Sequence, residues 1–210
     1  MSTNSTPLVT YPPSTYVASS RYIATFWPRF WASSVDLFIV GIANTLILLV
    51  VGSAVDKLGP KGMFLKVVLA LPYFAILNSR IGDGQTIGKR WMDIQVVDEN
   101  GATVSFARSF LRSLVFLVPY YLGLDIPSSA KLNWPMKASV QIFAILAYAT
   151  LYMVMFNRRN RQGIHDLVAR TYVAEHGAEI PPVKSSTWKP HWIILASLVI
   201  LDLLLDRLLR

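Results

Sequence analysis

The chain has 210 residues, of which 53% are hydrophobic and only 15% are charged. Soluble domains carry closer to a quarter charged residues, so this composition indicates an integral membrane protein. The sequence contains no cysteine, which excludes disulfides, thiol catalysis and cysteine-ligated metals. The net charge is +8 and the basic residues flank apolar runs, a distribution that favours anionic lipid headgroups, and not nucleic acid, as partners.

Residues 1–20 are polar and rich in Pro, Ser and Thr, which predicts a disordered tail and not a cleaved signal peptide. Apolar segments follow, each predicted as a helix, at about 31–51, 62–77, 106–124, 136–156 and 188–205. A linker at 176–187 precedes the C-terminal region 188–210, whose helix either crosses the membrane or rests on its surface. The predicted fold class is therefore an all-α membrane protein, a bundle of four to five transmembrane helices.

Lys and Arg residues are unevenly distributed among the predicted loops. The segments at 78–105 and 157–187 hold the excess, whereas the loop between the third and fourth helices contributes Lys131 and Lys137. The positive-inside rule therefore places the two basic loops and the N-terminus in the cytoplasm. This pattern favours the bacterial cytoplasmic (inner) membrane as the location.

Asp36 lies in the apolar run from Phe30 to Val51, which otherwise carries no charge. An ionised carboxylate inside a bilayer costs several kcal/mol unless it has a partner, water or a functional role. Arg29 precedes Asp36 by seven residues, so the two side chains share a helix face about 10 Å apart. Asn44 follows Asp36 by eight residues, roughly 80° around the helix, where it can help to coordinate an ion.

The segment 84–90 (GQTIGKR) follows the second helix and places two glycines around a small polar pair. Such a segment is typical of a tight turn with exposed backbone N–H groups. It can form an anion- or phosphate-binding nest assisted by Lys89 and Arg90, or a turn that docks on lipid headgroups. It lacks the Gly-Lys-Ser/Thr ending of a phosphate loop, so we do not expect nucleotide binding.

Residues 92–97 alternate weakly and are rich in β-branched side chains, 98–101 (DENG) form a turn, and 102–104 can return. This pattern predicts a small β-hairpin on the cytoplasmic face. Ser105 can then cap the next helix, whose first turns carry a basic stripe. We expect headgroup or anion contacts from Lys89, Arg90, Arg108, Arg112, Arg158, Arg159 and Arg161.

His165 and Asp166 are adjacent in the loop after the fourth helix. The pair can act as a proton relay, because histidine titrates near neutral pH, or it can form a structural hydrogen bond. With three histidines and no cysteine, the sequence offers too few ligands for a metal site, and it indicates no cofactor. No nucleophile-and-base arrangement is evident, so we do not predict an enzyme.

Three segments together resemble the RDD family of membrane proteins. They are 28–36 (PRFWASSVD), 84–90 with 96–98 and Gly101, and 164–171 (IHDLVART). The family is named after an arginine at the start of the first span, an aspartate within that span and a second aspartate. On this sequence those residues are Arg29, Asp36 and Asp166, and the resemblance covers about residues 21–175. The sequence departs from the family at Gln85, where a small residue is frequent, and in its additional C-terminal apolar segment.

The resemblance implies a function only in outline. The family has been associated with transport, some members resemble sodium-proton antiporters, and a eukaryotic branch acts as an adaptor in membrane protein degradation. A fold alone does not select among such roles. The resemblance therefore leaves several hypotheses open.

The first hypothesis is transport of an ion or a small solute. Asp36 would bind the ion, Arg29 would stabilise its charge, and Asp166 with His165 would pass protons. The chain is short and shows no evident repeat, so this hypothesis calls for a homo-oligomer. The second hypothesis is a non-transporting scaffold or accessory protein in which Arg29, Asp36 and Asp166 form a structural network. A third is lipid or amphiphile handling through the basic cytoplasmic face.

Overall fold

The computed structural model describes residues 22–56, 62–124, 133–157, 160–178 and 189–208. Its helices are α1 (Phe26–Asp56), α2 (Gly62–Leu77), α3 (Ile87–Trp91), α4 (Phe106–Pro119), α5 (Trp134–Phe156), α6 (Ile164–Ala169) and α7 (Lys189–Leu208). It also has a 3-10 turn, η3 (Arg80–Gly82), a π-helical turn, η4 (Tyr120–Leu124), and the strands β1 (Ile94–Asp98) and β2 (Thr171–Glu175). The predicted tail at 1–20 and residues 179–187 of the predicted linker lie outside the described residues.

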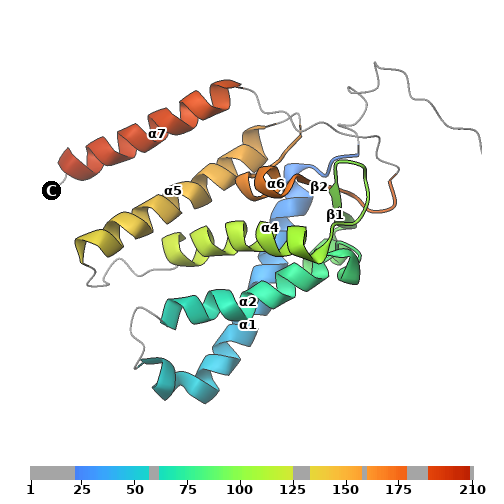
Figure 1. Cartoon of the computed structure of the whole chain (residues 1–210), viewed down its shortest axis with the longest axis horizontal. Coiled ribbons are helices and arrows are strands. Elements are labelled where there is room, and N and C mark those ends of the chain that lie inside the picture. Colours follow the sequence, from blue (N-terminus) through green and yellow to red (C-terminus); the bar gives the residue numbers. More distant parts are fainter. Residues whose placement is uncertain (1–21, 57–61, 125–132, 158–159, 179–188, 209–210) are drawn as a thin grey trace, which may run out of the picture.

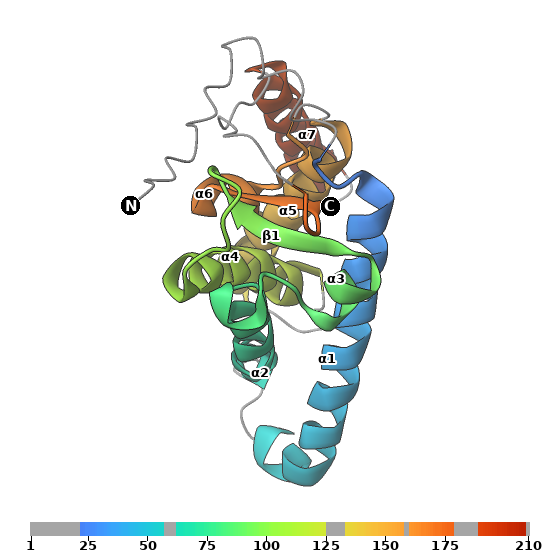
Figure 2. The same cartoon turned by 90° about the vertical axis from the view of Figure 1, so that its right-hand side faces the viewer.

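The long helices lie side by side, and the first helix crosses them. Figure 1 shows α2, α4 and α5 next to one another, with α7 against α5 and α1 running across the group. The short helices α3 and α6 and both strands gather at one end, where Figure 2 shows α3 lying against α1. We call this group of α3, β1, α6 and β2 the cap. The residues discussed below lie where the cap meets the long helices.

Within the described part of the chain, two helices are long and apolar enough to cross a membrane: Phe26–Val50 of α1 and Trp134–Phe156 of α5. α2 has 16 residues and contains Pro72, so it falls short of the roughly 20 residues that span a hydrocarbon core. Many large apolar side chains of α1 are exposed, including Phe38 and Leu49. Such exposure suits a helix whose surroundings are lipid. The structure thus supports a mostly helical membrane protein with two candidate spans, fewer than the four to five predicted.

The two strands form an antiparallel sheet that the sequence predicts only in part. β1 is found where a strand is expected, but its partner is β2, with Val96 opposite Val173. The expected return strand at 102–104 makes an isolated bridge, Val97 to Thr103. The segment 102–104 is too short to replace β2 as the partner of β1, because α4 begins directly after it. Ser105 caps α4 by accepting a hydrogen bond from the Arg108 N–H at 3.4 Å. The predicted hairpin is therefore corrected to a long-range pair, whereas the predicted cap at Ser105 is found.

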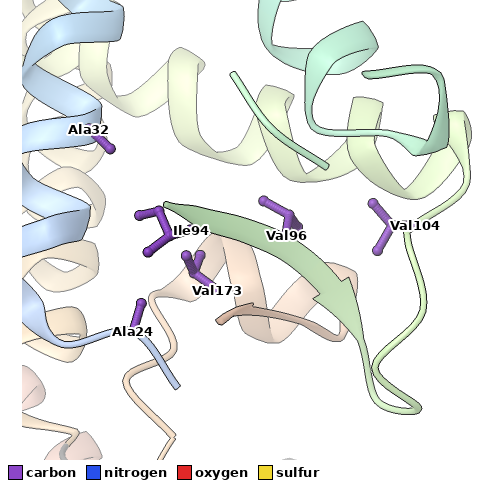
Figure 3. Close-up of a cluster of buried hydrophobic side chains, with 6 residues drawn as sticks. All are labelled: Ala24, Ala32, Ile94, Val96, Val104 and Val173. Atoms are coloured by element: carbon purple, nitrogen blue, oxygen red, sulfur yellow. The ribbon is translucent and has the colours of Figure 1, made fainter. Parts of the chain in front are cut away.

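A small apolar core holds the sheet against the start of α1. Figure 3 shows Ala24, Ala32, Ile94, Val96, Val104 and Val173 converging on the faces of β1. Ala32 is 1% exposed on α1, and Ile94 at the start of β1 is 2% exposed. A second core, with Phe74 and Leu117, joins α1, α2, α4 and η4. Full burial of a Val, Ile, Leu or Phe side chain contributes about 1.5–3 kcal/mol, so apolar contact is one of the forces that hold the cap to the helices.

Candidate functional site

Asp36 lies on α1 at the junction with α3, and its carboxylate is fully enclosed by hydrogen-bond donors. The hydroxyl of Tyr73 on α2 donates to Oδ1 at 2.7 Å, and the hydroxyl of Thr86 donates to Oδ2 at 2.5 Å. The backbone N–H of Gly88 also donates to Oδ1, at 2.8 Å. Asp36 has no exposed surface. The charge that is costly in an apolar helix is therefore satisfied by α2 and by the first turn of α3.

The sequence at 84–90 explains why α3 begins at this point. Thr86 is the N-cap of α3, where its hydroxyl accepts a hydrogen bond from the Lys89 N–H while donating to Asp36. Gly88 permits close approach to α1, because a Cβ at this position would lie 2.1 Å from the Ala32 carbonyl oxygen. The turn predicted to bind an anion does hold one, but that anion is the protein's own Asp36 carboxylate.

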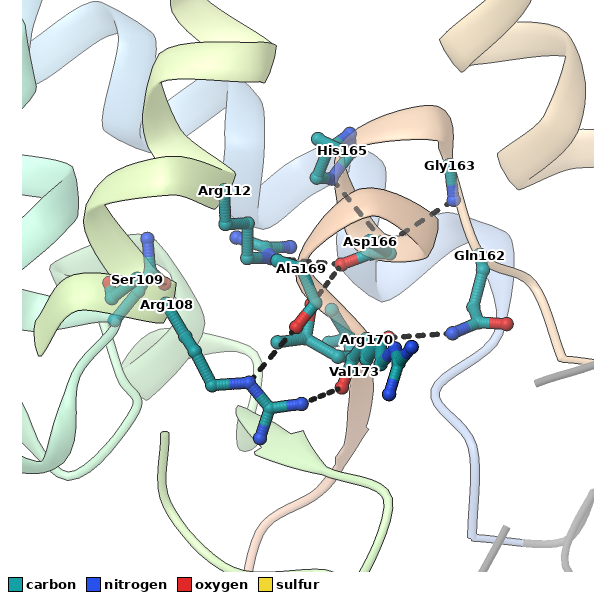
Figure 4. A network of polar contacts seen from close by, with 12 residues as sticks. Arg108, Ser109, Arg112, Gln162, Gly163, His165, Asp166, Ala169, Arg170 and Val173 are labelled. Atoms are coloured by element: carbon teal, nitrogen blue, oxygen red, sulfur yellow. Dashed lines mark hydrogen bonds and ion pairs between the residues drawn. The ribbon is translucent and has the colours of Figure 1, made fainter. Parts of the chain in front are cut away.

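Asp166 on α6 is the centre of a second polar cluster, drawn in Figure 4. Its Oδ1 accepts hydrogen bonds from Arg112 Nε at 2.8 Å and from the Thr171 hydroxyl at 3.1 Å. Its Oδ2 accepts from the Gly163 N–H at 3.3 Å and lies 3.4 Å from His165 Nε2 and 3.9 Å from an Arg29 terminal nitrogen. Asp166 is 1% exposed, so this buried carboxylate ties α4, α6, β2 and α1 together.

Arg29 joins the start of α1 to the cap chiefly through backbone acceptors. Its Nε donates to the Ala24 carbonyl at 3.1 Å, and one terminal nitrogen donates to the Val173 carbonyl at 2.8 Å. The other terminal nitrogen donates to the Arg161 carbonyl. The planar guanidinium can satisfy several acceptors at once, which an ammonium group cannot do in the same geometry. Arg29 therefore fixes both β2 and the loop before α6 against α1.

Lys89 is buried in the cap, close to both clusters. Its ammonium nitrogen donates to Asn78 Oδ1 at 2.8 Å and to the Thr86 hydroxyl at 3.4 Å. Burial, assisted by the nearby Arg112 guanidinium, lowers the pKa of Lys89 from its ordinary 10.5 to about 7. Lys89 thus changes charge near neutral pH inside the protein.

The pKa values of His165 and Asp166 are both lowered, which argues against a proton relay through this pair at neutral pH. Burial lowers the pKa of His165 from its ordinary 6.5 to about 4, despite the attraction of Asp166. Burial alone would raise the pKa of Asp166, but the Arg112 guanidinium and its other cationic neighbours outweigh this and hold it well below its usual range. The pair is thus a neutral imidazole beside an ionised carboxylate at pH 7.

The structure separates the predicted network into two sites. Arg29 and Asp36, both described, share no hydrogen bond or ion pair; Asp36 belongs to the α3 site and Arg29 to the Asp166 site. Asn44 bonds the Tyr121 hydroxyl at 3.4 Å and has no bond to Asp36 among the described contacts. Arg29 therefore does not contact Asp36, contrary to the expectation that it stabilises the Asp36 charge directly, because each side chain is bonded to other groups.

The basic residues predicted to contact headgroups differ in their exposure. Lys89 and Arg112 are 7% and 6% exposed, so neither side chain is presented on the outer surface of the protein. Arg108 bonds the carbonyls of Ala169 and Arg170 on the cap, as Figure 4 shows. Arg90 is exposed and Arg161 is half-buried, while Arg158 and Arg159 lie outside the described residues.

Sequence reasoning missed the partners of Asp36 and Lys89: Tyr73, Thr86 and Asn78. Tyr73 is a polar-tipped residue in the apolar second half of α2, and such a hydroxyl usually finds a partner when it is buried. Thr86 stands directly before a short helix, which is a capping signal. Nothing in the sequence marks Asn78. In the described part of the chain, no group of three His, Cys, Asp or Glu side chains is placed to hold a metal ion.

A cavity of about 290 Å³ lies between α1, α4 and α5 and reaches the Asp166 cluster. Its buried end is lined by Arg29, Lys89, Arg112, His165 and Asp166, and its remaining walls are largely apolar. Asp36 and Asn44 do not line it. The residues proposed to carry an ion are thus outside the cavity, and the second polar cluster faces it.

The chain is similar to known proteins over most of its length. The model of the RDD family matches residues 23–170, which include Arg29, Asp36 and Asp166. The chain is 30% identical over 154 residues to the "Uncharacterized protein YckC" of Bacillus subtilis (strain 168), covering 71% of this chain and 83% of that relative. No solved structure matches the chain significantly. The extent of the family match and the similarity to YckC show that the chain belongs to the RDD family.

Proposed function

We propose that this chain is a non-transporting membrane accessory protein, in which the RDD residues hold a rigid cap against membrane-embedded helices. The observation that carries the proposal is the state of Asp36. Its carboxylate accepts hydrogen bonds from Tyr73, Thr86 and Gly88, and it has no exposed surface. A side chain that carries an ion must bind the ion and release it to solvent. Asp36 would have to break its hydrogen bonds to these three donors to do so.

The proposal places the cap on the cytoplasmic side of a bacterial inner membrane, with the N-terminus on the same side. The excess of Lys and Arg in the loops around α3 and α6 supports this orientation. Besides α1 and α5, we assign α2, α4 with η4, and α7 to the membrane layer, because Figure 1 shows them lying alongside α5. This assignment gives five membrane helices, some of them too short to span alone.

The surface formed by η3 and by α3 of the cap carries exposed apolar and aromatic side chains together with charged ones. Trp91 is 72% exposed, Ile81 is 65% exposed and Ile87 is 49% exposed, with Arg80 and Arg90 exposed among them. Tryptophan and arginine next to exposed apolar side chains suit the level of lipid headgroups. Anionic headgroups, a membrane protein partner or a second copy of the chain are the partners we propose for this face.

Transport of an ion or a small solute is the second candidate. It is favoured by the cavity between α1 and α5, which is lined by Arg29, His165 and Asp166. A transported solute would pass this cluster and not Asp36. A pathway built in this way would need an exit on the cap side, which a homo-oligomer could supply.

Ion flux measurements separate the two candidates. The full chain would be reconstituted into liposomes with an internal pH-sensitive dye, and sodium or lithium would be added outside. We expect no cation-dependent pH change with the wild type, and a loss of stability in detergent for Asp36→Asn. Asp93→Asn, which changes an exposed aspartate on the cap, is the matched control for stability. Cation-dependent flux in the wild type would overturn the accessory role, whether or not a still-folded Asp36→Asn variant loses it.

A further inference from the structure

The cavity beside the Asp166 cluster has an excess of positive charge at its buried end. Arg29, Arg112 and Lys89 line this end, against the single lining carboxylate of Asp166. These groups are each at most 7% exposed. Because a guanidinium is always protonated, the groups that line this end keep a surplus of one positive charge even when Lys89 is neutral. Asp36 lies outside the lining, and its oxygens are already bonded to Tyr73, Thr86 and Gly88. A surplus of buried positive charge is costly, and an anion would relieve it.

The same end of the cavity has hydrogen-bonding capacity that the protein leaves unused. Among the described contacts, the Arg112 side chain makes one hydrogen bond, from Nε to Asp166, which leaves its two terminal amino groups available. Lys89, when protonated, has a third donor beyond its bonds to Asn78 and Thr86. Unused donors and a positive surplus together specify an anionic oxygen ligand.

The remaining walls of the cavity have the opposite character. They are formed mainly by apolar and aromatic side chains, such as Leu37, Phe74, Phe116 and Val154. The exposed lining residues are Phe30 on α1, Leu124 on η4, and Tyr148 and Leu151 on α5. The cavity therefore reaches the surface between α1 and α5, which are the two candidate membrane spans. An opening at that place faces lipid.

We propose that this cavity is a binding site for an amphiphile with one hydrocarbon chain and one anionic oxygen group, which enters from the membrane. The anionic group, a carboxylate or a phosphate, would lie against Arg112 and Lys89, with the chain along the apolar walls. The volume of about 290 Å³ is at the lower end of ligand pockets, which run from roughly 300 Å³. The cavity thus holds the anionic group and the first part of the chain, and the rest extends between α1 and α5 into the bilayer.

This site goes beyond the accessory role and does not depend on it, because Asp36 does not line the cavity. A free inorganic anion shares the charge of the ligand but gains nothing from the apolar walls. A neutral alcohol of the same chain length shares the apolar contact but leaves the buried cations uncompensated. Comparing these probes separates recognition of the amphiphile from either part alone.

Binding would be measured with the full chain in phosphatidylcholine nanodiscs, using radiolabelled palmitate in a scintillation proximity assay. We expect saturable palmitate binding, displaced by hexadecyl phosphate, but not by hexadecanol or by inorganic phosphate at the same concentration. Displacement by hexadecanol as effective as by hexadecyl phosphate would overturn anion recognition. Displacement of palmitate by inorganic phosphate would show an anion site that is open to water. That result would overturn the proposal that the ligand is an amphiphile.

Three variants locate the site. Ala147→Trp fills the cavity from α5 and should abolish binding, whereas Ala43→Trp, the same change at an exposed position of α1 outside the cavity, should leave it intact. Lys89→Gln keeps a donor for Asn78 but removes the charge, so we expect affinity to fall about tenfold with folding preserved. Should Ala147→Trp fail to fold, Lys89→Gln decides. Wild-type affinity in a folded Lys89→Gln variant, or equal binding by both tryptophan variants, would overturn the proposal.

Discussion

Asp36 and Gly88 are 52 residues apart in the chain and are joined by a 2.8 Å hydrogen bond from the Gly88 backbone N–H to the Asp36 carboxylate. This bond is possible only because Gly88 has no side chain between α3 and α1. The two helices cross so closely that the carbonyl of Ala32 occupies the space of a Cβ. The first RDD aspartate is therefore a docking point for the cap.

Gly88→Ala should separate α3 from α1. The added methyl group would lie 2.1 Å from the Ala32 carbonyl and 3.0 Å from Asp36 Oδ1, and backbone atoms cannot easily move aside. Overpacking of this kind costs about 1–3 kcal/mol, and more where backbone must shift. Unfolding of the purified protein in mixed micelles, followed by tryptophan fluorescence, measures the loss. Gly41→Ala is the control, because nothing lies within 4 Å of its added Cβ. Equal stability of the two variants would contradict the close docking.

Arg29→Lys should destabilise the protein although it keeps the charge. The guanidinium donates to the Ala24, Val173 and Arg161 carbonyls, and an ammonium group at the end of a thinner side chain cannot reach all of them. Buried carbonyls left without donors should cost about 2 kcal/mol or more. The same unfolding assay applies, with Arg90→Lys on the exposed side of α3 as the control. If Arg29→Lys proves as stable as Arg90→Lys, the charge alone is what matters at this position.

Acid should weaken the fold through His165. Its pKa is about 4 in the folded protein because burial lowers it, against an ordinary value of 6.5. Between these values the unfolded chain binds a proton that the folded chain does not. Stability is therefore fully present above pH 6.5 and falls as the pH drops towards 4, by an amount on the order of 3 kcal/mol. Asp166 adds a further loss below its ordinary pKa of 3.8, because its pKa is depressed in the fold.

Unfolding curves recorded between pH 7 and pH 4 would measure this loss. His165→Gln should flatten the dependence in that range, whereas His176→Gln, which changes an exposed histidine, should not. A slope that survives His165→Gln would assign the acid sensitivity to other groups.

Alkaline pH should strengthen the fold through Lys89. Its folded pKa is about 7, lowered by burial from 10.5. From pH 7 to 10.5 the unfolded chain holds a proton that the folded chain has released, so stability rises with pH. The increase should approach about 1.4 kcal/mol per pH unit. Lys89→Gln, compared with the wild type at pH 7.5 and pH 9, should remove this increase; a falling stability in the wild type would contradict the sign.

The sequence predicts the long helices well, because their apolar runs are long and few charged residues interrupt them. The second predicted helix, 62–77, has the bounds of α2, and Ser105 caps α4 as expected. The first predicted helix, 31–51, lies within α1, which extends five residues further at each end, and the fourth, 136–156, matches α5 except that α5 begins two residues earlier. These features depend on local sequence, so local reasoning finds them.

The cap is less predictable, because distant residues decide its structure. The segment 171–175 follows a basic loop and becomes a strand only by pairing with β1, about 75 residues earlier. Lys89 and Arg112 have long charged side chains, which are seldom buried unless paired, so a headgroup role is the natural expectation. Asn78 and Asp166 provide the partners that make their burial possible. No local sequence pattern predicts these partners, because they lie 11 and 54 residues away in the chain.

The contact between Arg29 and Val173 also constrains when the protein can finish folding. Val173 follows Arg29 by 144 residues. At the pace of a ribosome, α1 therefore waits on the order of ten seconds before β2 has been synthesised. Asp36 waits only for Gly88, 52 residues later. The nascent first helix must enter the bilayer with both charges lacking their final partners, and the two RDD sites are then completed in order, the aspartate early and the arginine last.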